Sequence, residues 1–249
     1  MLRMLTRPSS LEKISKMKRI GVVGGISWYS SLEYYKFLNR MAGEYFNTKE
    51  ETCADMLLVN IDVIKFRSLV SKGDDDGAYK MVLAAAKNAK AAGAEILILA
   101  ANGVHRFFDR LQKDIDVPMV HIADATGSAI IKADLKKVGL IGIRATMEKP
   151  FYSDRLRLMG IETIIPEEPD RTYIDSSINA ELVCGQFHNE TKEKYLEIIK
   201  RLIDRGAQGI ILGCTEIPIL IKPCDTTIPQ FVTSELHCAA TIKKAFSRC

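Results

Sequence analysis

Short apolar runs alternate with segments of helical periodicity along almost the whole chain. The apolar runs predict buried strands at residues 18–25, 56–61, 96–100, 117–122, 136–142, 162–166, 210–213 and 227–234. The segments between them predict helices at residues 27–44, 78–92, 104–113, 123–135, 149–159, 191–205 and 234–249. Strands that alternate with helices favour parallel sheets with right-handed crossovers. The pattern therefore predicts an α/β protein.

Three segments of the first half recur in the second half in the same order. The matched pairs are residues 18–24 with 136–142, 93–103 with 206–216, and 116–123 with 227–234. The distance between copies is far longer than the repeat of a solenoid protein. The chain is therefore predicted to hold two similar α/β lobes, each built on a parallel sheet.

The duplication also predicts the lobe boundaries. Residues 121–229 are assigned to the second lobe, and residues 18–120 together with 230–249 to the first, because the C-terminal helix is expected to return and complete it. Two facing lobes would place the strand ends at Ala101 and Cys214 on opposite walls of one cleft. Open α/β folds bind ligands at this carboxyl edge of the sheet.

Residues 1–17 are predicted to be a basic N-terminal extension, and it has two interpretations. Arg3, Arg7 and Lys13 stand among serines, and Glu12 is the only acid of this stretch. A disordered or loosely docked segment ahead of the first strand is the simpler interpretation. An Arg- and Ser-rich, acid-poor stretch is also typical of an organelle transit peptide.

Composition narrows the class of protein. The 249 residues are 47% hydrophobic and 27% charged with a net charge of +4, which is typical of a globular protein. No long basic stripe indicates nucleic-acid binding, and the apolar runs are shorter than the roughly 20 residues of a membrane helix. The six cysteines form no Cys-x-x-Cys pair and the four histidines form no close pair. These features predict reduced thiols, a cytoplasmic protein and no metal site.

Cys214 follows an apolar strand and precedes a predicted helix start at Thr215 and Glu216. A helix N-terminus lowers the pKa of a thiol and favours the thiolate, which acts as base or nucleophile. The alternative is a small buried hydrophobic side chain, a common role for a free cysteine. Both repeats turn polar just after the strand, at Asn102 in the first copy and Thr215 in the second, and this favours a functional thiol.

Four short motifs occur in order along the chain. They are GGISW at residues 24–28, HIADAT at 121–126, RATME at 144–148 and GCTEIP at 213–218. Together they resemble the aspartate/glutamate racemase superfamily, in its branch of pyridoxal-phosphate-independent amino-acid racemases. The resemblance covers about residues 18–246 and implies two Rossmann-like lobes related by a pseudo-twofold axis, with the active-site cleft between them. It also implies a cofactor-free site and a homodimer.

In that family one thiol from each lobe flanks the substrate Cα, so that one removes the proton and the other returns a proton from the opposite face. An amino-acid Cα–H is a very weak acid, so without an electron sink the proton must pass between closely positioned groups in a dry site. This sequence departs from the family at the first thiol. The family's Cys-Asn-Thr-x-His appears as Ala101-Asn102-Gly103-Val104-His105, and alanine can neither take nor give a proton.

The resemblance assigns substrate contacts to five residues. Asn102 is the candidate for binding the substrate carboxylate or amine, and Gly103 leaves room or backbone N–H access beside it. The candidate hydroxyl donors are Ser27, Thr126 and Thr215.

Four further residues have open roles. Arg171 lies where the family's substrate-binding lysine is missing, and it is either a clamp for a side-chain carboxylate or a solvated loop arginine. His105 is a candidate replacement base, although a capping or supporting hydrogen bond is the simpler interpretation. Glu216 is a candidate for orienting Thr215 or a substrate amine, and His121 is expected to be a satisfied buried group.

Three functions remain open on the sequence. The first is a cofactor-independent racemase or epimerase of an acidic or related amino acid, with Cys214 as one acid/base and Ala101 where the second thiol is missing. The second is a one-sided proton-transfer enzyme or decarboxylase that needs a single donor. The third is a catalytically silent protein that binds a small carboxylate. The partner in each case is a small amino acid or carboxylate.

Overall fold

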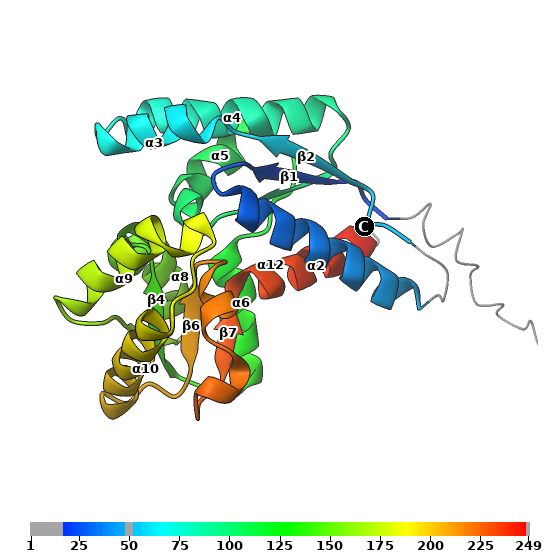
Figure 1. Ribbon diagram of the computed structural model, residues 1–249. Helices are drawn as coiled ribbons and strands as arrows, with labels where there is room; N and C mark the ends of the chain where they lie inside the picture. The colour runs from blue at the N-terminus through cyan, green and yellow to red at the C-terminus, as the bar shows by residue number, and fades with distance from the viewer. Residues whose placement is uncertain (1–16, 48–51, 248–249) are drawn as a thin grey trace, which may run out of the picture.

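The computed structural model describes residues 17–47 and 52–247, and within them two parallel sheets form two lobes (Figure 1). The first sheet has the order β2-β1-β3, and the second has the order β5-β4-β6-β7. The strands are β1 Ile20–Gly24, β2 Met56–Asn60, β3 Ile96–Leu99, β4 Lys137–Gly142, β5 Glu162–Ile164, β6 Ile210–Gly213 and β7 Gln230–Val232. The α/β class with two similar parallel-sheet lobes is confirmed, because β2-β1-β3 and β5-β4-β6 follow the same order.

Helices connect and cover these strands. The α-helices are α2 Trp28–Phe46, α3 Val63–Ser71, α4 Asp75–Ala91, α5 Phe108–Asp114, α6 Ile122–Lys132, α7 Arg144–Glu148, α8 Pro150–Leu158, α9 Asp170–Ala180, α10 Asn189–Asp204, α11 Ile217–Leu220 and α12 Thr233–Phe246. The 3₁₀ helices are η1 Gly103–Phe107, η2 Leu182–Cys184 and η3 Pro223–Asp225. In the first lobe α3 and α4 lie on one face of the sheet and α2 and α12 on the other (Figure 1).

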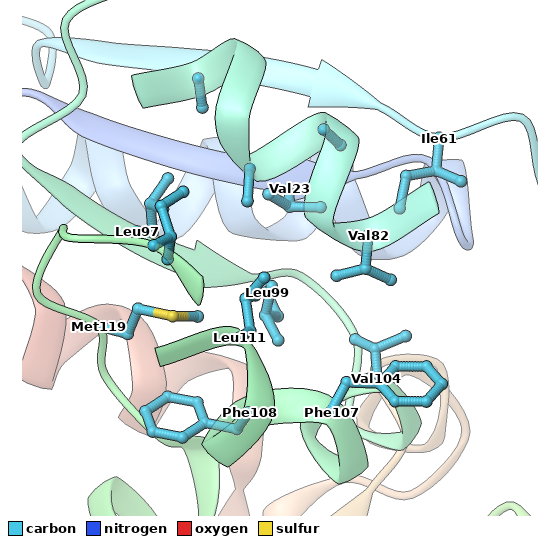
Figure 2. Close-up of a cluster of buried hydrophobic side chains, with 14 of the residues drawn as sticks. Val23, Ile61, Val82, Leu97, Leu99, Val104, Phe107, Phe108, Leu111 and Met119 are labelled. Atoms are coloured by element: carbon cyan, nitrogen blue, oxygen red, sulfur yellow. The ribbon is translucent and has the colours of Figure 1, made fainter. Parts of the chain in front are cut away.

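Strands β1, β3, β4 and β6 are buried on both faces, which explains their nearly continuous apolar runs. In β3, Leu97 and Leu99 join a core with α4 and α5, whereas Ile96 and Ile98 join a second core with α2 and α12. Figure 2 shows Leu97, Leu99 and Leu111 within the first of these cores. Strand β6 alternates in the same way, because Ile210 and Leu212 pack with α9 and α10 and Ile211 packs with α6 and α8.

One predicted strand is wrong, and two helices were not predicted. The predicted strand at residues 117–122 is reduced to a single bridge between Leu97 and Met119, because Pro118 accepts a hydrogen bond from the Leu97 N–H but has no N–H to donate. Helix α3 was not expected, although Val63, Phe66 and Val70 have helical spacing and Asp62 caps its N-terminus. The helix α9 was also not expected.

The boundary between the second lobe and the returning C-terminal segment lies after residue 232, whereas the sequence placed it before residue 230. Strand β7 pairs with β6, so residues 230–232 lie in the second sheet and not in the first lobe. Helix α12 then contacts both α2 and α6, and Cys238 and Ile242 join the core of the first lobe. The predicted extension at residues 1–17 lies outside the described residues except for Met17, which is buried.

Candidate active site

A cavity of about 300 Å³ lies between the two lobes at the carboxyl ends of the strands. Its walls come from the β1–α2 turn, α3, the β3–η1 junction, the end of β4, α9 and the turn after β6. Of the residues predicted to act at the site, the cavity brings together Ser27, Ala101, Asn102, Gly103, Cys214, Thr215 and Glu216.

The carboxylate of Glu216 is the centre of the second-lobe wall. Its Oε2 accepts hydrogen bonds from Cys214 Sγ at 2.9 Å and from Thr215 Oγ1 at 2.7 Å. Its Oε1 accepts one from Ser27 Oγ of the first lobe at 2.8 Å. Ser27 also caps α2, because its hydroxyl accepts from the Ser30 N–H. Glu216 therefore joins the thiol to both lobes.

The surroundings of Cys214 favour the protonated thiol, which donates a hydrogen bond to Glu216. Apolar surroundings, the negative charge of Glu216 and the hydrogen bond to its carboxylate raise the pKa of Cys214 well above the ordinary value. The expectation of a lowered pKa at a helix N-terminus is therefore wrong. Helix α11 has a single turn of four residues, and its N-cap is the acid Glu216. The site therefore places the Cys214 thiol, as proton donor, next to the Glu216 carboxylate as acceptor.

The first-lobe wall consists of Ala101, Asn102 and Gly103. Asn102 Nδ2 donates to Thr233 Oγ1 at 3.0 Å, and Thr233 Oγ1 donates its own proton to the Leu212 carbonyl. This chain of bonds fixes the orientation of the Asn102 amide, and Oδ1 is left buried with no partner among the described residues. The unpaired oxygen is an acceptor suited to an ammonium group.

Two arginines that the sequence analysis missed line the same cavity. Arg67 lies on α3 and makes no hydrogen bond or ion pair within the described part of the chain. Arg106 Nη1 donates to the Gly103 carbonyl at 2.9 Å, and its Nη2 pairs with Asp75 at 3.1 Å. The helical spacing of apolar residues around Phe66 could have predicted α3. Phe66 packs this helix against the sheet, and Arg67, the next residue, then lies near the carboxyl ends of the strands.

Thr126 and Arg171 do not line the cavity. The Thr126 hydroxyl is fully buried, donates to the Ile122 carbonyl and accepts from Tyr152 Oη at 3.0 Å. Arg171 pairs with Glu148 at 3.1 Å on a neighbouring surface. Both side chains are occupied by protein partners, so the structure supports neither as a direct ligand of a molecule in this cavity.

His105 also faces away from the cavity, into a buried group of three imidazoles. Its Nδ1 lies 2.9 Å from the Ala101 carbonyl, and its ring centroid lies 4.8 Å from that of His121 and 5.2 Å from that of His237. Burial, followed by the neighbouring imidazoles, holds the pKa of His105 well below its ordinary value. His105 therefore supports the backbone of the first-lobe wall instead of replacing the missing base.

The buried imidazoles predict a loss of stability in mild acid. Burial lowers the pKa of His237 to about 4 and that of His121 to about 2, whereas both groups titrate near 6.5 in an unfolded chain. The unfolded state therefore binds more protons below pH 6.5, so this contribution is complete above that pH and falls as the pH drops towards 4. For His237 alone the loss by pH 4 is about 3 kcal/mol.

Urea unfolding at pH 7, 6 and 5 measures this slope. A His237→Gln variant should flatten it, whereas His188→Gln, at an exposed position, should leave it unchanged. Equal slopes in all three proteins would contradict the assignment.

Metal and membrane sites are absent from the described residues. No group of histidine, cysteine and acidic side chains in residues 17–47 and 52–247 is placed to hold a metal ion. Within the same ranges, no helix combines the length and apolar character needed to cross a membrane.

Similarity to known proteins covers most of the chain. A candidate Asp/Glu racemase from Yersinia pestis is 35% identical with a TM-score of 0.86, over 93% of this chain and 100% of that one. An aspartate racemase homologue from Pyrococcus horikoshii OT3 is 33% identical with a TM-score of 0.81, over 93% and 100% of the two chains. A glutamate racemase from Hydrogenobaculum sp. is 29% identical over 55% of this chain, and the match spans only about half, 51%, of that relative. The profile of the Asp/Glu/Hydantoin racemase family matches residues 23–241. The chain therefore belongs to the Asp/Glu/Hydantoin racemase family.

Proposed function

We propose that the protein is a cofactor-independent racemase or epimerase that moves the Cα proton of an amino acid by means of Cys214. Membership of a racemase family supports an isomerase. The observation that carries the proposal is the hydrogen bond between Cys214 and Glu216 on the wall of a cavity that also holds an unpaired guanidinium.

The charges around the cavity suit a zwitterion. Arg67 supplies a cation for the α-carboxylate, and it also stabilises the negative charge that this carboxylate gains when the Cα proton leaves. The ammonium group pairs with Asn102 Oδ1 and with the Glu216 carboxylate. The largely apolar lining lowers the local dielectric constant, which strengthens each of these interactions.

Proton transfer begins with the thiol and the carboxylate. Glu216 takes the proton of Cys214, and the thiolate then removes the Cα proton, so that the C–H bond pair passes into the substrate carboxylate as an enediolate. The thiol is restored in this step, and Glu216 is left protonated. The raised pKa of Cys214 makes its thiolate a strong base, which suits a weakly acidic substrate.

The opposite face of the substrate lies towards Ala101, which has no titratable group. A water molecule on that side gives a proton to Cα, and the resulting hydroxide takes the proton held by Glu216. The configuration is inverted and the starting state returns. A less reactive second donor should make inversion slower than exchange.

A one-sided enzyme is the second candidate, and the alanine at position 101 favours it. In that case Cys214 exchanges or delivers a proton on one face only, as a decarboxylase of a malonate-type acid requires. A protein that only binds a small carboxylate is the third outcome.

Incubation in D2O with each enantiomer of a panel of amino acids separates these outcomes. NMR follows loss of the Cα–H signal, and chiral chromatography follows inversion. Exchange with inversion supports the proposal, and exchange with full retention supports the one-sided enzyme. An absence of exchange with every amino acid, together with thermal stabilisation by some of them, leaves only the binding protein.

The homodimer and the cytoplasmic location expected from the sequence belong to this proposal. Exposed apolar side chains of Trp28, Leu32 and Tyr35 follow one face of α2 and support an interface between two copies. Sedimentation of the full chain should then give twice the mass of 27.8 kDa; a monomer at micromolar concentration would contradict it.

A further inference from the structure

We propose that the substrate carries an apolar side chain and not an acidic one, a proposal that rests on the function given above. The cavity must hold the α-carboxylate, the ammonium group and a side chain at once. The polar groups of the site bind the α-carboxylate and the ammonium group. The remaining walls of the cavity determine which kind of side chain fits.

Most of the remaining wall is hydrocarbon from both lobes. The side chains are Phe66, Val70, Val104, Ile143, Ile178 and Val183. They come from α3, η1, the end of β4, α9 and η2, so the apolar character is shared by five separate segments. A side chain that fills this space removes apolar surface from water, which stabilises the complex by about 25 cal/mol for each Å².

Gly103 and Ile143 extend this apolar wall to the first lobe. A Cβ atom at position 103 would lie 3.0 Å from Ile143 Cδ1, closer than side-chain atoms normally approach. The isoleucine therefore packs against the glycine backbone across the lobe junction. Any side chain at position 103 would push this methyl group away, so the glycine lets Ile143 form part of the apolar wall, beside the polar side chains of Ser71 and Asn179 at its edge.

The cavity has one unpaired cation. Arg67 has no partner among residues 17–47 and 52–247, whereas both terminal nitrogens of Arg106 already donate, to the Gly103 carbonyl and to Asp75. Arg171, the predicted clamp for a side-chain carboxylate, pairs with Glu148 outside the cavity. Its neighbour Thr172 donates to Glu168. An α-amino acid uses Arg67 for its own carboxylate, so a second carboxylate would enter the apolar wall unpaired, which is strongly unfavourable.

Leucine and aspartate give a direct comparison, because their side chains have the same branched shape and differ in charge. We expect the rate of Cα exchange per unit concentration to be about 100-fold or more higher for leucine than for aspartate. Asparagine, the neutral polar isostere, should fall between them. Equal or faster exchange of aspartate would overturn the apolar substrate class and leave the proposed function standing.

A cation added to the apolar wall should weaken the preference for leucine. Val70 lines the cavity from α3 and is 40% exposed, so a Val70→Lys variant can be accommodated. It should lower the ratio of leucine to aspartate exchange about tenfold or more, which weakens the preference for leucine without having to invert it. Ile64→Lys is the matched control, because Ile64 lies on the same helix, is 79% exposed and does not line the cavity. An unchanged ratio in Val70→Lys would contradict the assignment of this wall to the side chain.

Measurements of ligand binding test the substrate class independently of the proposed reaction. If no amino acid of the panel exchanges, the proposed function fails, and thermal stabilisation by leucine but not aspartate still supports an apolar side-chain site. Stabilisation by aspartate alone, or by neither amino acid, overturns it.

Discussion

Replacing Cys214 with serine is expected to lower Cα exchange about 1000-fold. Serine keeps the size of the side chain and can still donate to Glu216, but its hydroxyl is a far weaker acid than a thiol. The loss should appear in kcat with little change in KM, because the thiol acts on the Cα proton and not on the groups that bind the substrate. Exchange measured by NMR in D2O gives both constants.

The matched control for this variant is Cys224→Ser, which changes an exposed thiol of the same lobe. It should retain the activity of the unmodified protein. Full exchange by the Cys214→Ser variant would exclude both enzymatic functions as proposed.

The pH dependence adds a signature that a structural cysteine would not produce. The pKa of Cys214 is raised by its surroundings and by Glu216, so exchange should increase with pH as the thiolate forms. A Glu216→Gln variant removes the negative charge and should move this rise to lower pH, while lowering the maximum rate, because the acceptor of the thiol proton is lost. A profile that does not move would contradict the coupling between the two side chains.

Replacing Arg67 with methionine is expected to raise KM about 10- to 100-fold. Methionine keeps much of the length of the side chain but removes the cation that faces the cavity. A smaller fall in kcat should accompany it, because the same guanidinium stabilises the enediolate.

Lys65→Met is the control for Arg67→Met. Lys65 lies on the same helix with a side chain that is 77% exposed, and it does not line the cavity. An unchanged KM in Arg67→Met would assign the carboxylate to another group, and Arg106 is then the remaining cation of the cavity.

The duplicated pattern was sufficient to predict the fold and the two wall segments of the cavity. The repeated apolar strands indicate burial on both faces, and the polar residues after them indicate the edge of the sheet. The positions of Ala101, Asn102 and Cys214 at this edge could therefore be predicted from the sequence. These are properties of each strand and its immediate neighbours. These local patterns predict the site because a parallel sheet places the carboxyl ends of its strands at the same edge.

The contacts that define the chemistry come from segments far apart in the chain and could not be predicted in this way. Ser27 reaches Glu216 across 189 positions, and Thr233 reaches Asn102 across 131. The local motif after β6 indicated a lowered pKa for Cys214, whereas burial between the two lobes, followed by the charge of Glu216, raises that pKa. The positions of Thr126 and Arg171 outside the cavity could not be predicted either, because they depend on partners elsewhere in the chain, Tyr152 and Glu148.

The hydrogen bond between Ser27 and Glu216 makes the Glu216 carboxylate a shared element of the two lobes. Ser27 precedes α2 in the first lobe, and Glu216 follows β6 in the second. A substitution that changes how the lobes pack should therefore also displace the carboxylate that accepts from Cys214, even where the substituted residue lies far from the cavity.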